Sequence, residues 1–251
     1  MLAQEIAQNY HRLTDSIALA CSAAQRAPDS VLLLAVSKTH LVESVLAAYH
    51  AGARDFGENY VQEGTEKIEA LDALLPDNQA QWHFIGPLQS NKTRAVAEYF
   101  DWVHSLDRLK IAQRLNEQRP ASRTPLNVCV QVNIDDEASK SGCLPEDALD
   151  LALQIAQLPN LRLRGLMTIP QAINRNASHT EQCAPFAALS ALFAQIKSEL
   201  PSAQAEHFDT LSMGMSDDYA QAISAGSTMV RIGTAIFGAR AYSASIPSPQ
   251  G

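Results

Sequence analysis

HFDTLSMGMSDDYAQAISAGSTMVRIGT, residues 207–234, contains two short apolar stretches that each end in a Gly/Ser/Thr turn. The stretches 207–213 and 228–233 have the length of buried strands, and the residues between them are typical of a helix. We expect Ser216 to cap this helix and Gly226 to lie near its end. A strand, a helix and a second strand in this order predict one βαβ unit of a parallel sheet.

The same alternation of apolar runs and helical segments extends back through the chain. A helix is expected over 3–26, the earlier strands over 31–38, 53–59, 82–86, 102–106, 127–133 and 161–169, and the earlier intervening helices over 41–51, 60–74, 88–98, 107–118, from Pro145, and over 181–199. Eight strand–helix repeats in 251 residues predict an α/β fold, a (β/α)8 barrel with an extra N-terminal helix. An open doubly wound sheet is the alternative, although the first βα turn lacks G-x-G-x-x-G.

We expect a single domain over 1–240 and a disordered Ser/Pro-rich tail over 241–251. The net charge of −8 disfavours nucleic acid and acidic membranes as partners. The start of the chain shows no signal peptide, and no apolar run is long enough to span a membrane, so a cytoplasmic protein is expected. A monomer is expected because the sequence shows no obvious apolar interface stripe. The four cysteines lack metal-ligand spacing, which predicts reduced thiols and no metal site.

The carboxyl ends of the strands form the active face of such a barrel. Most of the residues at these ends are polar or small: Lys38, Asn59, Gly86, Ser105, Asn133, Met167, Ser212 and Gly233. Lys38 ends an apolar strand, where it either leaves the core for solvent or serves as a partly buried amine that forms a Schiff base.

The turns at 212–216 and 233–234 follow the last two strands, where barrels often bind phosphate through backbone N–H groups. Ordinary capped turns are the alternative. Arg231 shares a strand face with Gly233, either in the barrel mouth or in a buried salt bridge. A lysine, a phosphate site and an arginine in one mouth suggest a phosphorylated aldehyde. Pyridoxal 5′-phosphate (PLP) fits this description, and so does a sugar phosphate in an aldolase.

Eight motifs occur along the chain in the order AVSKTH, FGENYVQE, WHFIGPLQSNK, VHSLDR, VQVNIDDEASKSG, GLMTIP, LSMGMSDDY and MVRIGTAIFGAR. Over residues 30–240 this set resembles the pyridoxal phosphate homeostasis protein family, whose fold is similar to the N-terminal barrel of alanine racemase. His40 departs from the pattern, since a basic residue such as lysine is expected there.

The resemblance implies that Lys38 carries PLP as an internal aldimine and that Asn59 lines the pocket near the ring. The resemblance also implies four phosphate-binding residues and an arginine opposite the pyridine nitrogen. His83 and Met167 are implied as further residues of the ring pocket, with a hydrogen-bonded core histidine as the alternative for His83. The phosphate-binding residues and the arginine are Ser212, Gly214, Gly233, Thr234 and Arg231.

The arginine favours a carrier of PLP over an enzyme. A guanidinium only donates hydrogen bonds, so it keeps the pyridine nitrogen unprotonated and makes the ring a weak electron sink. A two-base racemase also needs a domain after the barrel, for which the chain leaves no room. We therefore expect a protein that buffers PLP and delivers it to apo PLP-dependent enzymes, without robust catalytic turnover. The alternative is a PLP-dependent racemase or lyase of narrow specificity.

Overall fold

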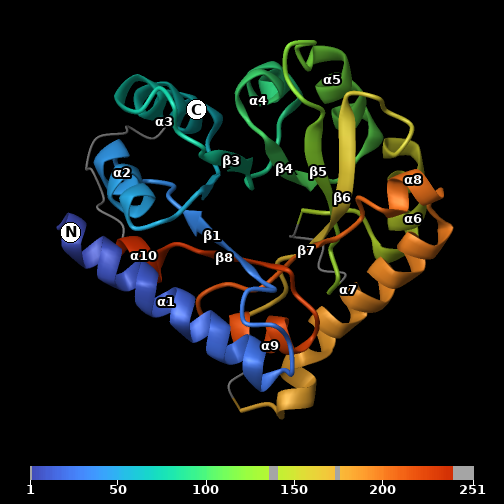
Figure 1. The fold of residues 1–251 in the computed structure, drawn as a ribbon. Coiled ribbons are helices and arrows are strands. Elements are labelled where there is room, and N and C mark those ends of the chain that lie inside the picture. The colour runs from blue at the N-terminus through green and yellow to red at the C-terminus, as the bar shows by residue number, and fades with distance from the viewer. Residues whose placement is uncertain (1, 136–140, 173–175, 240–251) are drawn as a thin grey trace, which may run out of the picture.

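The computed structural model describes residues 2–135, 141–172 and 176–239. Eight parallel strands form one closed barrel in chain order (Figure 1). They are β1 (Leu32–Val36), β2 (Asp55–Glu58), β3 (Gln81–Phe84), β4 (Trp102–Leu106), β5 (Leu126–Gln131), β6 (Leu161–Met167), β7 (Thr210–Ser212) and β8 (Met229–Ile232). The barrel closes where β1 pairs with β8, with Leu34 opposite Arg231. The predicted barrel is therefore confirmed, and the open sheet is wrong.

Helices surround the barrel. They are α1 (Ala3–Ala23), α2 (Val42–His50), α3 (Val61–Leu74), α4 (Thr93–Tyr99), α5 (Leu109–Gln118), α6 (Pro145–Ile155), α7 (His179–Glu199), α8 (Ser202–Ala205), α9 (Tyr219–Ser224) and α10 (Thr234–Phe237), with a 3-10 turn, η1 (Ser90–Lys92). Their apolar stripes, such as Ile111 and Leu115 of α5, face the outer side of the strands and form the main core with them.

The extra N-terminal helix packs across the place where the barrel closes. Its buried face contains Ile6, Leu13, Ile17 and Cys21, which recur at helical spacing. Figure 1 shows α1 running beside α2, α9 and α10, and these helices are in contact with it. Because α2 follows β1 and α10 follows β8, α1 joins the first and last units of the barrel.

Helix α4 begins at Thr93, after the 3-10 turn η1, and not at 88 as predicted, and two further helix starts differ from the prediction for local hydrogen-bonding reasons. Helix α7 begins at His179 because Ser178 and Glu181 form a capping box at its start. Ser216 does not cap α9, which begins only at Tyr219. Asp218 is the residue before the helix, and its carboxylate instead accepts the backbone N–H of Met215 at 2.5 Å. Ser216 is thereby left outside the helix.

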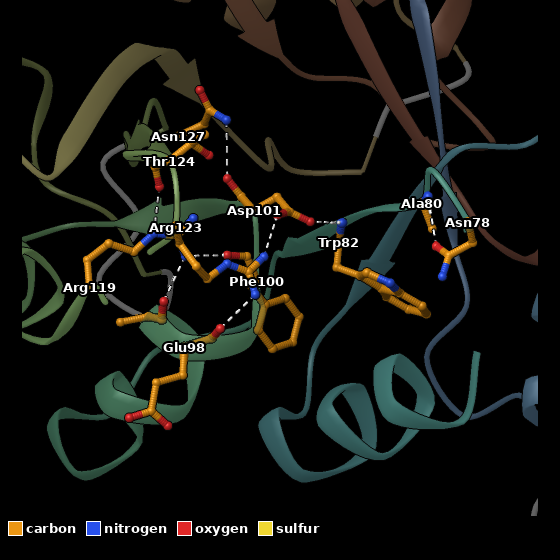
Figure 2. Close-up of polar contacts among 11 residues, drawn as sticks. Asn78, Ala80, Trp82, Glu98, Phe100, Asp101, Arg119, Arg123, Thr124 and Asn127 are labelled. Atoms are coloured by element: carbon orange, nitrogen blue, oxygen red, sulfur yellow. Dashed lines mark hydrogen bonds and ion pairs between the residues drawn. The ribbon is translucent and has the colours of Figure 1, made fainter. Parts of the chain in front are cut away.

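Two arginines, Arg119 and Arg123, form hydrogen bonds between neighbouring segments at the amino-terminal end of the barrel, opposite the predicted active face (Figure 2). Arg119 donates to the carbonyls of Ala97 and Phe100, both at 2.7 Å, and to that of Thr124. Asp101 accepts from the Trp82 backbone N–H at 2.9 Å and from Arg123 at 2.7 Å. These bonds satisfy buried carbonyls at the starts of β4 and β5, so this end stabilises the fold.

Within the described ranges, no helix is long and apolar enough to cross a membrane. The same residues contain no cluster of His, Cys, Asp or Glu that could hold a metal ion. The expected tail over 241–251 lies outside the part of the chain that the structure describes.

Candidate functional site

A pocket opens at the carboxyl ends of the barrel strands, with a cavity volume of about 190 Å³. The residues that line it come from β1 and β8, from the segments that follow β1, β2, β3 and β6, and from both predicted turns. They are Val36, Lys38, His40, Asn59, Ile85, Ile169, Met215, Ser216, Arg231, Gly233 and Thr234. The structure therefore brings together five of the predicted site residues: Lys38, Asn59, Arg231, Gly233 and Thr234.

Lys38 is half-buried and follows β1 by two residues, on a turn with unusual backbone geometry. The next residue, Thr39, has φ 65°, a left-handed conformation that β-branched residues rarely adopt. Such a conformation costs about 1–2 kcal/mol and persists only where the surroundings hold it. Here the Glu63 carboxylate accepts the Thr39 backbone N–H at 2.5 Å, which fixes the turn that carries Lys38.

A buried group of charges lies behind this turn. Lys67 Nζ is 2.7 Å from Glu58 Oε1, 2.6 Å from Glu63 Oε1 and 2.7 Å from the carbonyl oxygen of Ser37. The Ser37 hydroxyl also donates to Glu58, at 2.6 Å. Burial raises the pKa of Glu58, and the neighbouring Lys67 ammonium opposes that rise. Lys67 thus joins α3 to the residue immediately before Lys38.

The two turns supply backbone donors to the pocket. Among the described residues, the N–H groups of Ser216, Gly233 and Thr234 have no hydrogen-bond acceptor. A Cβ atom on Gly233 would lie 2.8 Å from the carbonyl oxygen of Val36, so a side chain there would force β8 away from β1. Unpaired N–H groups beside side-chain hydroxyls form a site that suits an oxyanion such as phosphate.

Ser212 and Gly214 lie beneath this pocket and are absent from its lining. The Ser212 side chain is fully buried and is bonded to His104 and Arg231 inside the barrel. Gly214 has φ 99°, and a Cβ atom there would lie 2.7 Å from Cβ of Ala222. The conformation of Gly214 therefore lets the chain turn tightly over α9, after which Met215 and Ser216 reach the pocket.

Arg231 lines the pocket from below, held by residues of β7 and of the segment after β6. Its Nη1 atom donates to the carbonyl oxygen and the hydroxyl of Ser212, at 2.5 and 2.8 Å, and Nη2 donates to the Thr168 carbonyl oxygen at 2.8 Å. Burial lowers its pKa to about 10, so the guanidinium keeps its charge at neutral pH. Three of the five N–H donors of an arginine are used by these contacts, and two remain.

Two expected residues of the ring pocket, His83 and Met167, lie deeper than the lining. Both are fully buried, and the residues two positions further along the chain, Ile85 and Ile169, line the pocket instead. Residues two apart share a strand face but differ by about 6–7 Å along the strand. His83 and Met167 therefore point into the barrel below the pocket, and His83 is the hydrogen-bonded core histidine of the alternative interpretation.

Six lining residues were not among the predicted site residues: Val36, His40, Ile85, Ile169, Met215 and Ser216. Ser216 was detectable as the second serine of the turn at 212–216, but its position suggested a helix cap. The isoleucines had no polar signal, since an apolar residue at a strand end looks like any core residue. His40 contacts the ring of Phe237 on α10, with centroids 5.2 Å apart.

The fold and the site together define a barrel of the alanine racemase type. A family model described as "Alanine racemase, N-terminal domain" matches residues 13–241. Alanine racemase from Corynebacterium glutamicum has the same fold, with a TM-score of 0.65 at 15% sequence identity, over 97% of this chain and 63% of that one.

Relatives with higher identity specify the family. Pyridoxal phosphate homeostasis proteins of Pasteurella multocida and Escherichia coli K12 are 56% and 52% identical to this chain, covering 95% of it and 99% and 98% of their own lengths. PipY of Synechococcus elongatus, solved with PLP bound, is 36% identical, with a TM-score of 0.72 over 88% of this chain and 100% of that one. The chain belongs to the pyridoxal phosphate homeostasis protein family, which confirms the resemblance seen in its motifs.

Proposed function

We propose that this chain binds PLP in the pocket, with a covalent bond between the Lys38 amine and the aldehyde carbon of PLP, and that it buffers and delivers the cofactor. The observation that carries the proposal is that one pocket holds a half-buried lysine together with two turns whose N–H groups are unpaired among the described residues. The PLP-bound relative, PipY, supports the choice of ligand over a sugar phosphate.

The chemistry of the lining fits PLP at three points. The N–H groups of Ser216, Gly233 and Thr234 suit its phosphate. The remaining donors of Arg231 suit an unprotonated pyridine nitrogen, which is an acceptor. Asn59 Oδ1 is buried without a hydrogen-bond partner in the described structure, and a bound ligand would satisfy it.

In this proposal the deeper residues act through those that line the pocket. Gly214 shapes the phosphate-binding turn, and Ser212 holds Arg231. Met167 lies below the pocket lining, in a small apolar cluster with Trp102 and Cys129 inside the barrel.

A carrier explains the lining better than a racemase or lyase does. PLP supplies an electron sink for carbanions when its ring nitrogen is protonated, and Arg231 opposes that protonation. Catalysis at an α-carbon also needs a positioned base. Besides Arg231, the titratable residues lining the described pocket are Lys38 and His40, so with Lys38 bonded to PLP the pocket lining offers His40 as its remaining general base. We further propose that the protein works as a cytoplasmic monomer that passes PLP to apo-enzymes.

The first test is borohydride reduction of the purified protein, followed by peptide mass spectrometry. We expect a phosphopyridoxyl group on the peptide that contains Lys38, and none on the peptides that contain Lys67 or Lys92. Protein that contains PLP but leaves Lys38 unmodified would contradict the covalent assignment.

The second test separates carrier from enzyme. The loaded protein is incubated in D2O with each common amino acid, and exchange of the α-proton is followed by NMR. In parallel, it is mixed with an apo PLP enzyme and the recovered activity is measured. A carrier restores the activity and catalyses no exchange, whereas rapid exchange with one amino acid would favour the racemase or lyase.

A further inference from the structure

A line of polar side chains crosses the interior of the barrel from the pocket toward the opposite end. Arg231 Nη1 is 2.8 Å from Ser212 Oγ, and this oxygen is 2.8 Å from His104 Nδ1. His104 Nε2 is 2.9 Å from His83 Nδ1, and His83 Nε2 is 3.0 Å from Asp55 Oδ1. Five strands contribute one residue each, and we call the five residues the interior chain.

The interior chain has one consistent arrangement of protons when both histidines are neutral. The guanidinium only donates, so the Ser212 hydroxyl accepts from it and gives its own proton to His104 Nδ1. A neutral imidazole has one donor nitrogen and one acceptor nitrogen, so His104 Nε2–H donates to His83. His83 Nε2–H then donates to the Asp55 carboxylate. The cation at the pocket is linked to an anion through three neutral groups.

The burial of the interior chain indicates that its hydrogen bonds serve more than packing. His83, His104 and Ser212 are all 0% exposed, and polar groups at such depth are costly unless each is hydrogen-bonded. Burial also lowers the pKa of His104 well below its ordinary value, in agreement with a neutral ring. A barrel interior that served packing alone is more simply filled by branched apolar residues.

Packing holds the two imidazoles in place. The His83 ring stacks on Trp102 with centroids 5.1 Å apart and 9° between the planes. The His104 ring meets His83 edge-on, with centroids also 5.1 Å apart. At the far end, the Asp55 side chain is 20% exposed and is therefore in contact with water. The acceptor that His104 offers to Ser212 is therefore fixed in direction.

We propose that His104 and His83 are positioning residues, anchored by Asp55, which orient the Arg231 guanidinium under the pocket through Ser212. The inference rests on the proposed function in one respect, namely that Arg231 faces the ring of PLP. Without the His104 acceptor, the Ser212 hydroxyl turns away from its present direction and Arg231 loses a fixed contact. The guanidinium keeps its bonds to the carbonyl oxygens of Ser212 and Thr168 but loses one of its three contacts, so the direction of its remaining donors is less fixed.

The test uses four variants of the full chain. His104→Leu removes both hydrogen-bonding nitrogens, whereas His104→Gln keeps one donor and one acceptor. Asp55→Ala removes the anchor at the accessible end, where a folding defect is less severe. Cys129→Ala is the matched control, because Cys129 is fully buried in the barrel interior beside Met167 and Trp102 and is not part of the interior chain.

Two readouts are made on each variant that passes a thermal-unfolding check. The first is the NMR signal of the Arg231 side chain in protein free of PLP, where a held guanidinium rotates slowly. The second is the absorption spectrum and Kd of bound PLP. We expect His104→Leu to speed the rotation, shift the spectrum and weaken PLP about tenfold, the loss of about one hydrogen bond to a charged group. His104→Gln should recover most of the slow Arg231 rotation and most of the PLP affinity. Asp55→Ala should change the rotation and the affinity in the same direction as His104→Leu. Cys129→Ala should change neither the rotation nor the affinity.

Unchanged Arg231 signals in His104→Leu, or in Asp55→Ala if the first variant does not fold, would overturn the inference. Equal effects of Cys129→Ala and His104→Leu would also overturn it, since they would reflect packing alone. The NMR readout needs no cofactor. A response of Arg231 to His104→Leu in a protein that binds no PLP would support the interior chain and contradict only the proposed function.

Discussion

The Lys67 ammonium lies 2.7 Å from Glu58 Oε1 and, with the same nitrogen, donates to the carbonyl oxygen of Ser37 at 2.7 Å. Ser37 is the residue before Lys38, so a buried ion pair between α3 and β2 fixes the backbone that presents the reactive amine. An ion pair in this position has no direct access to a ligand in the pocket. The ion pair contributes by fixing the geometry of the turn. The hydrogen bond from the Thr39 backbone N–H to Glu63 fixes the same turn.

Replacing Lys67 with Met should lower the free energy of unfolding by about 3–5 kcal/mol, because the buried Glu58 carboxylate loses its counter-charge. Urea denaturation measures this change. The double variant Lys67→Met/Glu58→Gln should regain part of the loss, since no unpaired charge remains. A single-variant loss below about 1 kcal/mol would show that water reaches the pair and that it does not hold the turn.

Replacing Lys38 with Ala should abolish the visible absorption of the covalently bound cofactor. Binding through the phosphate turns should persist at lower affinity, because the N–H groups of Ser216, Gly233 and Thr234 are unaffected. Spectrophotometry and equilibrium dialysis with PLP measure the two effects. Lys197→Ala, on α7 away from the pocket lining, is the control. An unchanged spectrum in Lys38→Ala would mean that an amine other than that of Lys38 forms the covalent bond with PLP.

Replacing Ser216 and Thr234 together with Ala should weaken PLP binding far more than pyridoxal binding, by about tenfold for each hydroxyl lost. Ser212→Ala is the informative comparison. Its hydroxyl bonds to Arg231 below the pocket, so we expect similar losses for PLP and pyridoxal. Fluorescence titration with both ligands measures the ratio. A phosphate-specific loss in Ser212→Ala would mean that its side chain turns toward the pocket when ligand binds.

The stability of the ligand-free protein should fall as the pH drops below about 6.5, the ordinary pKa of histidine. Burial lowers the pKa of His104, so the folded chain keeps this ring neutral while the unfolded chain protonates it. The unfolded state then binds more protons, and the free energy of unfolding falls by up to about 1.4 kcal/mol per pH unit.

Urea denaturation between pH 7.5 and 5 measures this slope in the unmodified protein and in His104→Gln. The variant should lack the contribution of His104, whereas Glu58, whose pKa burial raises, contributes in both proteins and cancels in the comparison. Identical slopes would show that His104 does not resist protonation in the fold.

Several features could be predicted from the sequence because they depend on local pattern. Strands short enough to be buried alternate with segments of helical period, and parallel strands joined in this way close into a barrel. Residues at the carboxyl ends of strands meet at one face, which identified Lys38, Asn59 and the turn at Gly233 and Thr234. Arg231 lies two residues before Gly233, yet it reaches the pocket because its side chain is long.

The depth of a residue in the barrel could not be predicted in the same way. Ile85 and His83 share a strand face, and so do Ile169 and Met167, but only the isoleucines line the pocket. Strand stagger sets the level of each residue, and the sequence pattern of alternation does not encode that level. His104, which links His83 to Ser212, was not among the predicted site residues because a histidine within an apolar strand has no local sign of its partner.

By itself, the sequence determined the closed barrel, because the barrel follows from order and periodicity along the chain. It also determined the family, because its motifs resemble those of known members. The end of the barrel at which the pocket lies could be predicted because the carboxyl ends of parallel strands meet at one face. Only the tertiary structure decided which hydroxyls face the pocket and which hold its floor. Gly214, at φ 99°, redirects the chain so that Ser216 reaches the pocket while Ser212 stays inside. The hydrogen bonds that connect Arg231 to Asp55 join strands distant in sequence, and such contacts exist only once the barrel has closed.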